Sequence, residues 1–161
     1  MGRRALRKLM VAWLGHAPSP LVQEPHGKPR LEEEEIEFSI SRREDWCAVA
    51  LSTDCPVGVD LEPIRPLAGL EGIVQQFFPP ATRAAYDAAA REDRMATFFW
   101  WWTRIEAAVK ASGTGLDASG SCFNGVACQS FDVPPALALA VAAKADDTVI
   151  VAPGIETALV L

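Results

Sequence analysis

Two pairs of charged residues in this sequence have a spacing that could support chemistry. Glu106 and Lys110 are four residues apart in a helical stretch, so their side chains lie on one face. Asp60 and Glu62 are two residues apart in a stretch that alternates apolar and polar residues, so in a strand their carboxylates lie side by side. Paired carboxylates can hold a hard divalent cation, and a nearby lysine can neutralise an anionic substrate.

Each pair also has a simpler structural interpretation. An isolated Glu-x-x-x-Lys is usually an exposed ion pair, and the acids of a strand can face water. If Asp60, Glu62 and Glu106 instead converge, each pair of carboxylates repels by roughly 4 kcal/mol at about 4 Å and an effective dielectric near ~20. Such a cluster requires a cation or protons. A magnesium ion that bridges the acids to a substrate pyrophosphate meets this requirement.

The elements that must position these residues form an α+β pattern. In chain order we predict a helix over about 2–14, a loop over 15–30, strands over 46–52 and 56–62, helices over 69–77, 80–91 and 92–112, and strands near 121–131, 136–143 and 147–152. The long helix ends at Gly113, the residue type that most often terminates a helix.

Two further features of these elements bear on the site. Gly58 lacks a side chain, so either a ligand or another backbone segment can approach the strand closely. The tryptophans at 100–102 cannot all face one core. Either at least one of them borders a groove or a partner surface, or the helix is buried on several sides.

The overall composition excludes several classes of protein. The 161 residues include 15 basic and 21 acidic side chains, giving a formal net charge of −6, which argues against nucleic-acid binding. Hydrophobic residues make up 50% of the chain, but no apolar run approaches the roughly 20 residues that span a bilayer. The segment 1–30 holds 6 basic residues against 1 acidic residue, which favours a local site for an anion.

The cysteines argue against a zinc site. None of the 4 cysteines forms a Cys-x-x-Cys pair, and there are only 2 histidines. The cysteines could form a disulfide or have a redox role. We expect instead small, buried, reduced side chains in a cytoplasmic protein.

Six segments match, in order, the motifs of one enzyme family. They are Arg4-Ala5-Leu6-Arg7-Lys8-Leu9, Gly27-Lys28-Pro29, Phe38-Ser39-Ile40-Ser41, Val57-Gly58-Val59-Asp60-Leu61-Glu62, Phe77-Phe78-Pro79, and the stretch from Trp102 to Gly113. On these segments the chain resembles the 4′-phosphopantetheinyl transferases, specifically the longer, surfactin-synthetase-activating type. Each motif is weak alone, but the Asp-x-Glu strand, the Glu-x-x-x-Lys helix and the Gly-Lys-Pro segment are jointly specific.

The resemblance implies an enzyme that transfers the phosphopantetheine arm from coenzyme A to a serine of an acyl, aryl or peptidyl carrier protein. It implies that Asp60, Glu62 and Glu106 hold Mg²⁺ and that Glu106, directly or through water, is the general base for the serine hydroxyl. Lys110 would neutralise or protonate the departing phosphate oxygen. Asp60, Glu106 and Lys110 are then the catalytic residues.

The same resemblance implies the substrate contacts. Lys28, Ser41, Arg42 and Lys110 would bind the phosphates of coenzyme A. The partners would be coenzyme A and an apo carrier protein, with no nucleic acid and no membrane.

The fold implied by the resemblance is one domain, residues 1–161, with two similar α+β halves related by a pseudo-twofold axis. The first half, about 1–57, is abbreviated relative to the second, about 58–161. A thin first half leaves apolar surface uncovered, so the chain could be a monomer or a homodimer.

Two positions depart from the family pattern. Arg42 stands where the family has histidine, and an arginine can still pair with a phosphate. Ile105 stands where the family has lysine, which removes a positive charge near the phosphates. An alternative function is therefore a catalytically impaired relative that binds coenzyme A or a carrier protein without turnover.

Overall fold

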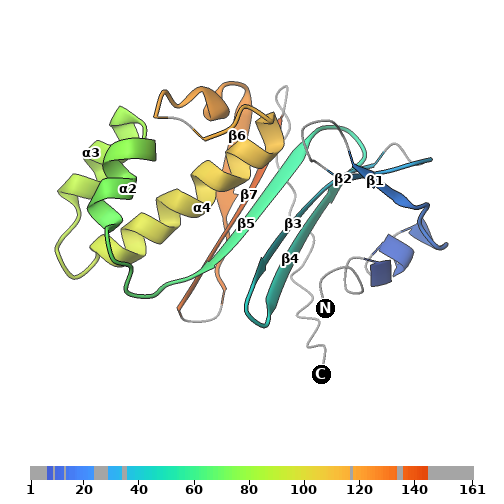
Figure 1. Cartoon of the computed structure of the whole chain (residues 1–161), viewed down its shortest axis with the longest axis horizontal. Helices are drawn as coiled ribbons and strands as arrows, with labels where there is room; N and C mark the ends of the chain where they lie inside the picture. Colours follow the sequence, from blue (N-terminus) through green and yellow to red (C-terminus); the bar gives the residue numbers. More distant parts are fainter. Residues whose placement is uncertain are drawn as a thin grey trace.

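The computed structural model describes residues 7–8, 10–12, 14–23, 29–33, 36–116, 118–133 and 136–144. Its central feature is a long helix, α4 (Arg94–Ser112), which lies along the strand β5 (Val57–Pro63). Figure 1 shows the hairpin of β3 (Glu37–Arg43) and β4 (Trp46–Ser52) beside β5, away from α4. The strand β5 is therefore enclosed between a helix and a hairpin.

The described strands form three small antiparallel sheets. In one, β1 (Leu21–Gln23) pairs with β2 (Pro29–Leu31), and in the second β3 pairs with β4. The third has the order β5-β7-β6, with β7 (Leu137–Lys144) between β5 and β6 (Val126–Ser130). The last sheet supports α4 and thus positions the helix that carries Glu106 and Lys110.

Two core clusters fix α4 in place. Its C-terminal half buries small residues, among them Ala107 and Ala111, with Ala140 and Ala142 of β7 in the same cluster. Its N-terminal half packs Phe98 against the short helices α2 (Leu70–Phe77) and α3 (Pro80–Ala88). The small residues let helix and sheet approach closely, while larger aromatic residues pack at the other end of the helix.

The structure confirms the predicted α+β class and the elements around the site. The long helix ends at Ser112, and Gly113 follows in the left-handed conformation with φ 72°. The predicted strands 46–52, 56–62 and 136–143 match β4, β5 and β7 within a residue.

Other predicted elements differ. The strand expected over 121–131 is a short 3-10 helix, η1 (Ser121–Phe123), followed by β6, and the loop expected over 15–30 contains β1 and the start of β2. The strand β3 had no counterpart among the predicted elements. The described residues between 7 and 14 are helical, as predicted, whereas the strand near 147–152 lies outside the described residues.

The cysteine prediction is only partly correct. None of the cysteines is part of a disulfide, and Cys122 is buried as expected, but Cys47 is exposed on β4. In the described part of the chain, no helix is both long enough and apolar enough to cross a membrane.

Candidate active site

Asp60 and Glu62 lie in the interior of the protein, at 1% and 5% exposure. The simpler interpretation, in which the polar face of this strand is in water, is therefore wrong. Both faces of β5 are covered, because α4 packs on it and the β3–β4 hairpin adjoins it. Burial of two carboxylates is costly unless they are paired or bound to cations, so their partners determine what the site can do.

Gly58 sets the distance between β5 and α4. A Cβ atom at Gly58 would lie 2.0 Å from the carbonyl oxygen of Ala107 and 2.7 Å from the backbone nitrogen of Ala111. Of the two alternatives for Gly58, the structure shows that a backbone segment, not a ligand, occupies the space. This close approach aligns the C-terminal half of α4 with the acids of β5.

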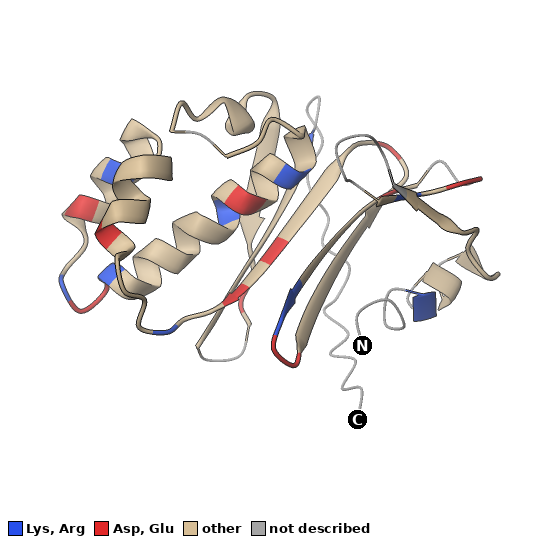
Figure 2. Cartoon of the chain, in the orientation of Figure 1, with Lys and Arg blue, Asp and Glu red and all other residues tan. Residues whose placement is uncertain are grey.

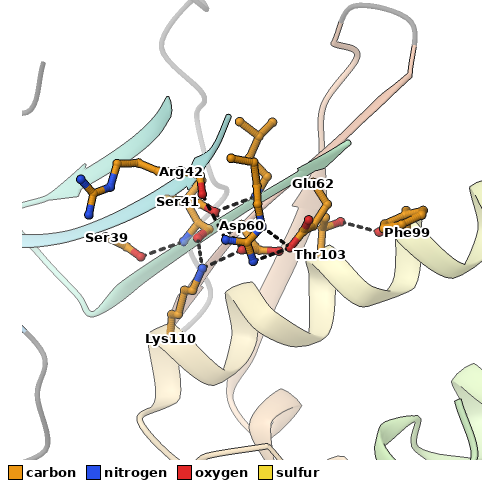
Figure 3. A network of polar contacts seen from close by, with 11 residues as sticks. Ser39, Ser41, Arg42, Asp60, Glu62, Phe99, Thr103 and Lys110 are labelled. Carbon is orange, nitrogen blue, oxygen red and sulfur yellow. Dashed lines mark hydrogen bonds and ion pairs between the residues drawn. The ribbon is translucent and has the colours of Figure 1, made fainter. Parts of the chain in front are cut away.

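Lys110 is the direct link between helix and strand. Its Nζ donates to Oδ1 of Asp60 at 2.7 Å and to the carbonyl oxygen of Val59 at 3.0 Å (Figure 3). The lysine side chain is 30% exposed whereas that of Asp60 is 1% exposed, so the cation reaches from the surface to a buried acid. The Glu-x-x-x-Lys helix and the Asp-x-Glu strand thus meet at this ion pair.

Hydroxyl groups of β3 form the other wall of the site. Oγ of Ser41 donates to Oδ1 of Asp60 at 2.9 Å and accepts the backbone N–H of Leu61 at 3.1 Å. Oγ of Ser39 accepts the N–H of Val59 at 3.1 Å. Since β3 and β5 belong to different sheets, these side chains take the place of a backbone ladder between them.

The second oxygen of Asp60 has no partner. Oδ1 receives both Lys110 and Ser41, but Oδ2 is buried and makes no hydrogen bond. A buried carboxylate oxygen without a donor is costly, and a bound cation is one means of satisfying it. This oxygen is the feature of the site that best fits a metal ion.

Glu62 is held by an arginine from β3. Nε of Arg43 donates to Oε1 of Glu62 at 2.7 Å, and a second guanidinium nitrogen contacts the same oxygen. The hydrogen bond to Glu62 is the main reason that the pKa of Arg43 is raised. Figure 2 shows basic positions at the end of β3, acidic positions in the turn of the β3–β4 hairpin, and acidic positions along β5.

Glu106 lies one helical turn before Lys110 and has no hydrogen-bond partner among the described residues. Burial raises the pKa of its carboxyl, and the negative charge of Asp60 raises it further, while Lys110 lowers it. Glu62 acts in the same direction as Asp60, so the three acids share one electrostatic environment. Within the described ranges, however, no three acidic, histidine or cysteine side chains form a group that could hold a metal ion as they stand.

Comparison with known proteins identifies the family. Residues 56–146 match the sequence model of the 4′-phosphopantetheinyl transferase superfamily. The chain belongs to this superfamily. Over 121 residues it is 31% identical to the 4′-phosphopantetheinyl transferase HetI of Nostoc sp., covering 71% of this chain and 51% of that protein. Over 119 residues it is 31% identical to a Synechocystis sp. protein named "Putative 4′-phosphopantetheinyl transferase slr0495", covering 71% of this chain and 48% of that protein.

The match includes the residues that define the site of this phosphopantetheinyl transferase homologue. Asp60, Glu62, Glu106 and Lys110 all lie within the matched residues 56–146. The chain spans about half the length of the curated relatives that it matches.

The remaining predicted site residues of this superfamily member are those expected to bind coenzyme A. Lys28 lies outside the described residues. Arg42 is exposed on β3, next to Arg43. Ser41 is 3% exposed and its hydroxyl is engaged with Asp60 and Leu61, so its contact with coenzyme A stays a prediction.

Ile105 and Trp100 lie on faces of α4 that point away from the acids of β5, and they differ in burial. Ile105, at the family's lysine position, is fully buried in the aromatic cluster. Trp100 is 42% exposed and borders a pocket of about 240 Å³, with the guanidinium of Arg104 4.5 Å from its ring centre. Trp100 therefore lines a pocket, and α4 is also buried on several sides, so both alternatives for the tryptophans hold.

Sequence reasoning missed the roles of Ser39 and Arg43. Both alternate with Ser41 along β3, so the three side chains point to the same face of the strand. A strand prediction over 37–43 would have grouped them. Their chemistry then indicates a polar face directed at the acids of β5 instead of at solvent.

Proposed function

We propose that this chain transfers the 4′-phosphopantetheine arm of coenzyme A, in a magnesium-dependent reaction, to a serine of an acyl, aryl or peptidyl carrier protein. The observation that carries the proposal is the ion pair between Lys110 of α4 and Asp60 of β5, beside the unpartnered Oδ2 of Asp60. The names of both curated relatives support the same activity.

The donor set fits a magnesium site. Asp60, Glu62 and Glu106 supply the hard oxygen ligands that Mg²⁺ prefers, and Asp60 Oδ2 is buried with no donor to satisfy it. Bound Mg²⁺ would neutralise charge on the pyrophosphate of coenzyme A.

Glu106 is the proposed general base. Its pKa is raised by burial and by the charge of Asp60, which brings its proton affinity closer to that needed near neutral pH. It has no hydrogen-bond partner among the described residues, so its carboxylate is free to accept the proton of the incoming serine hydroxyl.

Lys110 is proposed to neutralise the leaving phosphate. Its Nζ is held beside Asp60 and the Val59 carbonyl, and its side chain remains 30% exposed, so one face of the ammonium group can reach a substrate. Lys28 and Arg42 are proposed to bind further phosphates of coenzyme A. Ser41 is proposed to orient Asp60 and to contact a phosphate of coenzyme A.

The proposal extends to the subtype and the partners. We assign the chain to the surfactin-synthetase-activating type, with halves of about 1–57 and 58–161, a cytoplasmic location and a monomeric or homodimeric state. With this proposed division, the hydrogen bond from Ser41 to Asp60 joins the first half to the second.

The direct test is incubation of the chain with coenzyme A, Mg²⁺ and a panel of apo carrier proteins, followed by mass spectrometry. The expected result is a carrier heavier by one phosphopantetheine arm. Asp60→Asn and Glu106→Gln should abolish the product while circular dichroism shows a folded chain. Glu92→Gln, which changes an exposed acid in the turn before α4, is the matched control and should retain activity. Unmodified carriers throughout the panel would contradict the proposal.

One observation favours a second candidate, a relative that binds without turnover. The family's lysine is replaced by the buried Ile105, and no three-carboxylate metal group is formed among the described residues. Calorimetry that detects Mg²⁺-dependent binding of coenzyme A, together with no modified carrier, would support this candidate over the transferase.

A further inference from the structure

We propose that Arg43 is a resident counter-cation for Glu62, so that a divalent cation entering this site is held by Asp60 and Glu106 while Glu62 stays paired with Arg43. The inference rests on the proposed function, because it concerns the metal site that the function requires. It changes the expected ligand set from three carboxylates to two.

The first support is the geometry of the ion pair. Nε of Arg43 lies 2.7 Å from Oε1 of Glu62, and a second nitrogen of the guanidinium contacts the same oxygen. The Glu62 side chain is only 7% exposed, whereas that of Arg43 is 47% exposed. A nearly buried carboxylate thus has its charge neutralised by a cation that reaches in from the surface.

The second support is that the register of β3 against β5 positions Arg43 beside Glu62. Ser39 contacts Val59, Ser41 contacts Asp60 and Leu61, and Arg43 contacts Glu62, so the contacts advance together along β3 and β5. The register of the hydroxyl contacts therefore directs the arginine to Glu62.

The third support is the acceptor capacity left on the other acids. Oδ2 of Asp60 is buried without a partner, and Glu106 has no hydrogen bond or ion pair among the described residues. Glu62 already receives two contacts on one oxygen. Asp60 and Glu106 are therefore the two carboxylates that do not pair with Arg43, which agrees with the absence of a three-acid metal group in the described part of the chain.

The charges at the site favour the same arrangement. Three carboxylates and the cations Arg43 and Lys110 leave one net negative charge. A divalent cation bound by all three acids would have to share the single negative charge of Glu62 with Arg43. If the Arg43–Glu62 pair persists, the incoming cation faces two carboxylates that are offset only by Lys110.

The test is a titration of the full chain with Mn²⁺, a spectroscopic substitute for Mg²⁺, in which electron paramagnetic resonance measures the free ion. Arg43→Gln should tighten binding roughly tenfold, because it removes a nearby positive charge and frees Glu62. Arg65→Gln removes an exposed positive charge just beyond β5 and should change affinity by less than about twofold. Asp60→Asn should abolish binding in every background.

The decisive variant is the double substitution Arg43→Gln with Glu62→Gln, which removes the ion pair as a unit. If Glu62 is not a ligand, the double variant binds Mn²⁺ within about threefold of the unaltered chain. A loss of about tenfold or more would show that Glu62 is a ligand and would overturn the inference. Unchanged affinity in Arg43→Gln alone would also overturn it, and this variant alters only a half-exposed side chain.

These outcomes are distinct from failure of the proposed function. Mn²⁺ binding with the expected pattern, but no modification of any carrier protein, would contradict the transferase and leave the role of Arg43 intact. Absence of Mn²⁺ binding in the unaltered chain and in both Arg43 variants would show that there is no metal site, and it would contradict both proposals.

Discussion

The hydroxyl of Ser41 on β3 donates to Oδ1 of Asp60 on β5 at 2.9 Å, and the same oxygen of Ser41 accepts the N–H of Leu61. One small side chain thereby orients the buried acid and joins two sheets that share no backbone ladder. The site lies at this junction, so its geometry depends on contacts that also hold the fold together.

Replacement of Ser41 by alanine tests this dual role. Ser41→Ala leaves the Leu61 N–H without its acceptor and removes a donor to Asp60, so we expect a loss of about 1–3 kcal/mol in the free energy of unfolding. Ser39→Ala, the matched control, removes only the acceptor of the Val59 N–H and should cost about 1 kcal/mol less. Urea unfolding measures both. Equal losses would show that the contact with Asp60 contributes nothing to stability.

The contact between Gly58 and α4 predicts opposite effects of the same substitution at two glycines. Gly58→Ala places a methyl group against the backbone of Ala107, which cannot rotate away, so we expect destabilisation by about 3 kcal/mol or more. Gly72→Ala, on α2, meets no atom within 4 Å and should stabilise the chain by about 0.5–1 kcal/mol. Thermal unfolding of the two variants distinguishes them, and a neutral Gly58→Ala would contradict the packing described for β5.

The parts of the site that could be predicted from the sequence are those set by local patterns. Alternation of apolar and polar residues indicated the strand that carries Asp60 and Glu62, and Gly113 marked the end of the helix that carries Lys110. Their contact could not be derived from such patterns, because 50 residues separate Lys110 from Asp60. The family resemblance supplied that relation.

The strand β3 could not be predicted for a physical reason. Its alternate residues Ser39, Ser41 and Arg43 are polar or charged, so the segment lacks the apolar alternation of a half-buried strand. In the structure these side chains face buried groups of β5. A polar face that is satisfied by another buried polar face has no signature in hydrophobic periodicity.

The ion pair between Lys110 and Asp60 predicts a non-additive effect on stability. Lys110→Met leaves the charge of Asp60 buried with only Ser41 as donor, and we expect a loss of about 1–3 kcal/mol, less than for a fully buried pair because the lysine is 30% exposed. Adding Asp60→Asn to Lys110→Met should recover part of this loss, because the unpaired charge is gone. A double-mutant cycle by urea unfolding measures the coupling, and additive losses would indicate that the pair does not stabilise the fold.

The raised pKa of Glu106 predicts a pH-dependent gain in stability for Glu106→Gln. Below the ordinary carboxyl pKa of 4.5 the side chain is protonated in both the folded and the unfolded chain, so the substitution should have little effect. As the pH rises from 4.5 through the higher pKa of the folded state, the unfolded chain ionises first, and the native chain loses stability relative to it. Above that folded pKa the full cost of a buried charge beside Asp60 is present.

Glu106→Gln removes the cost of this buried charge, so in the presence of EDTA its melting temperature should exceed that of the unaltered chain at pH 8, and the difference should vanish near pH 4. Glu92→Gln, at an exposed position, is the control and should show no such trend; a pH-independent difference for Glu106→Gln would mean that burial near Asp60 does not perturb this carboxyl.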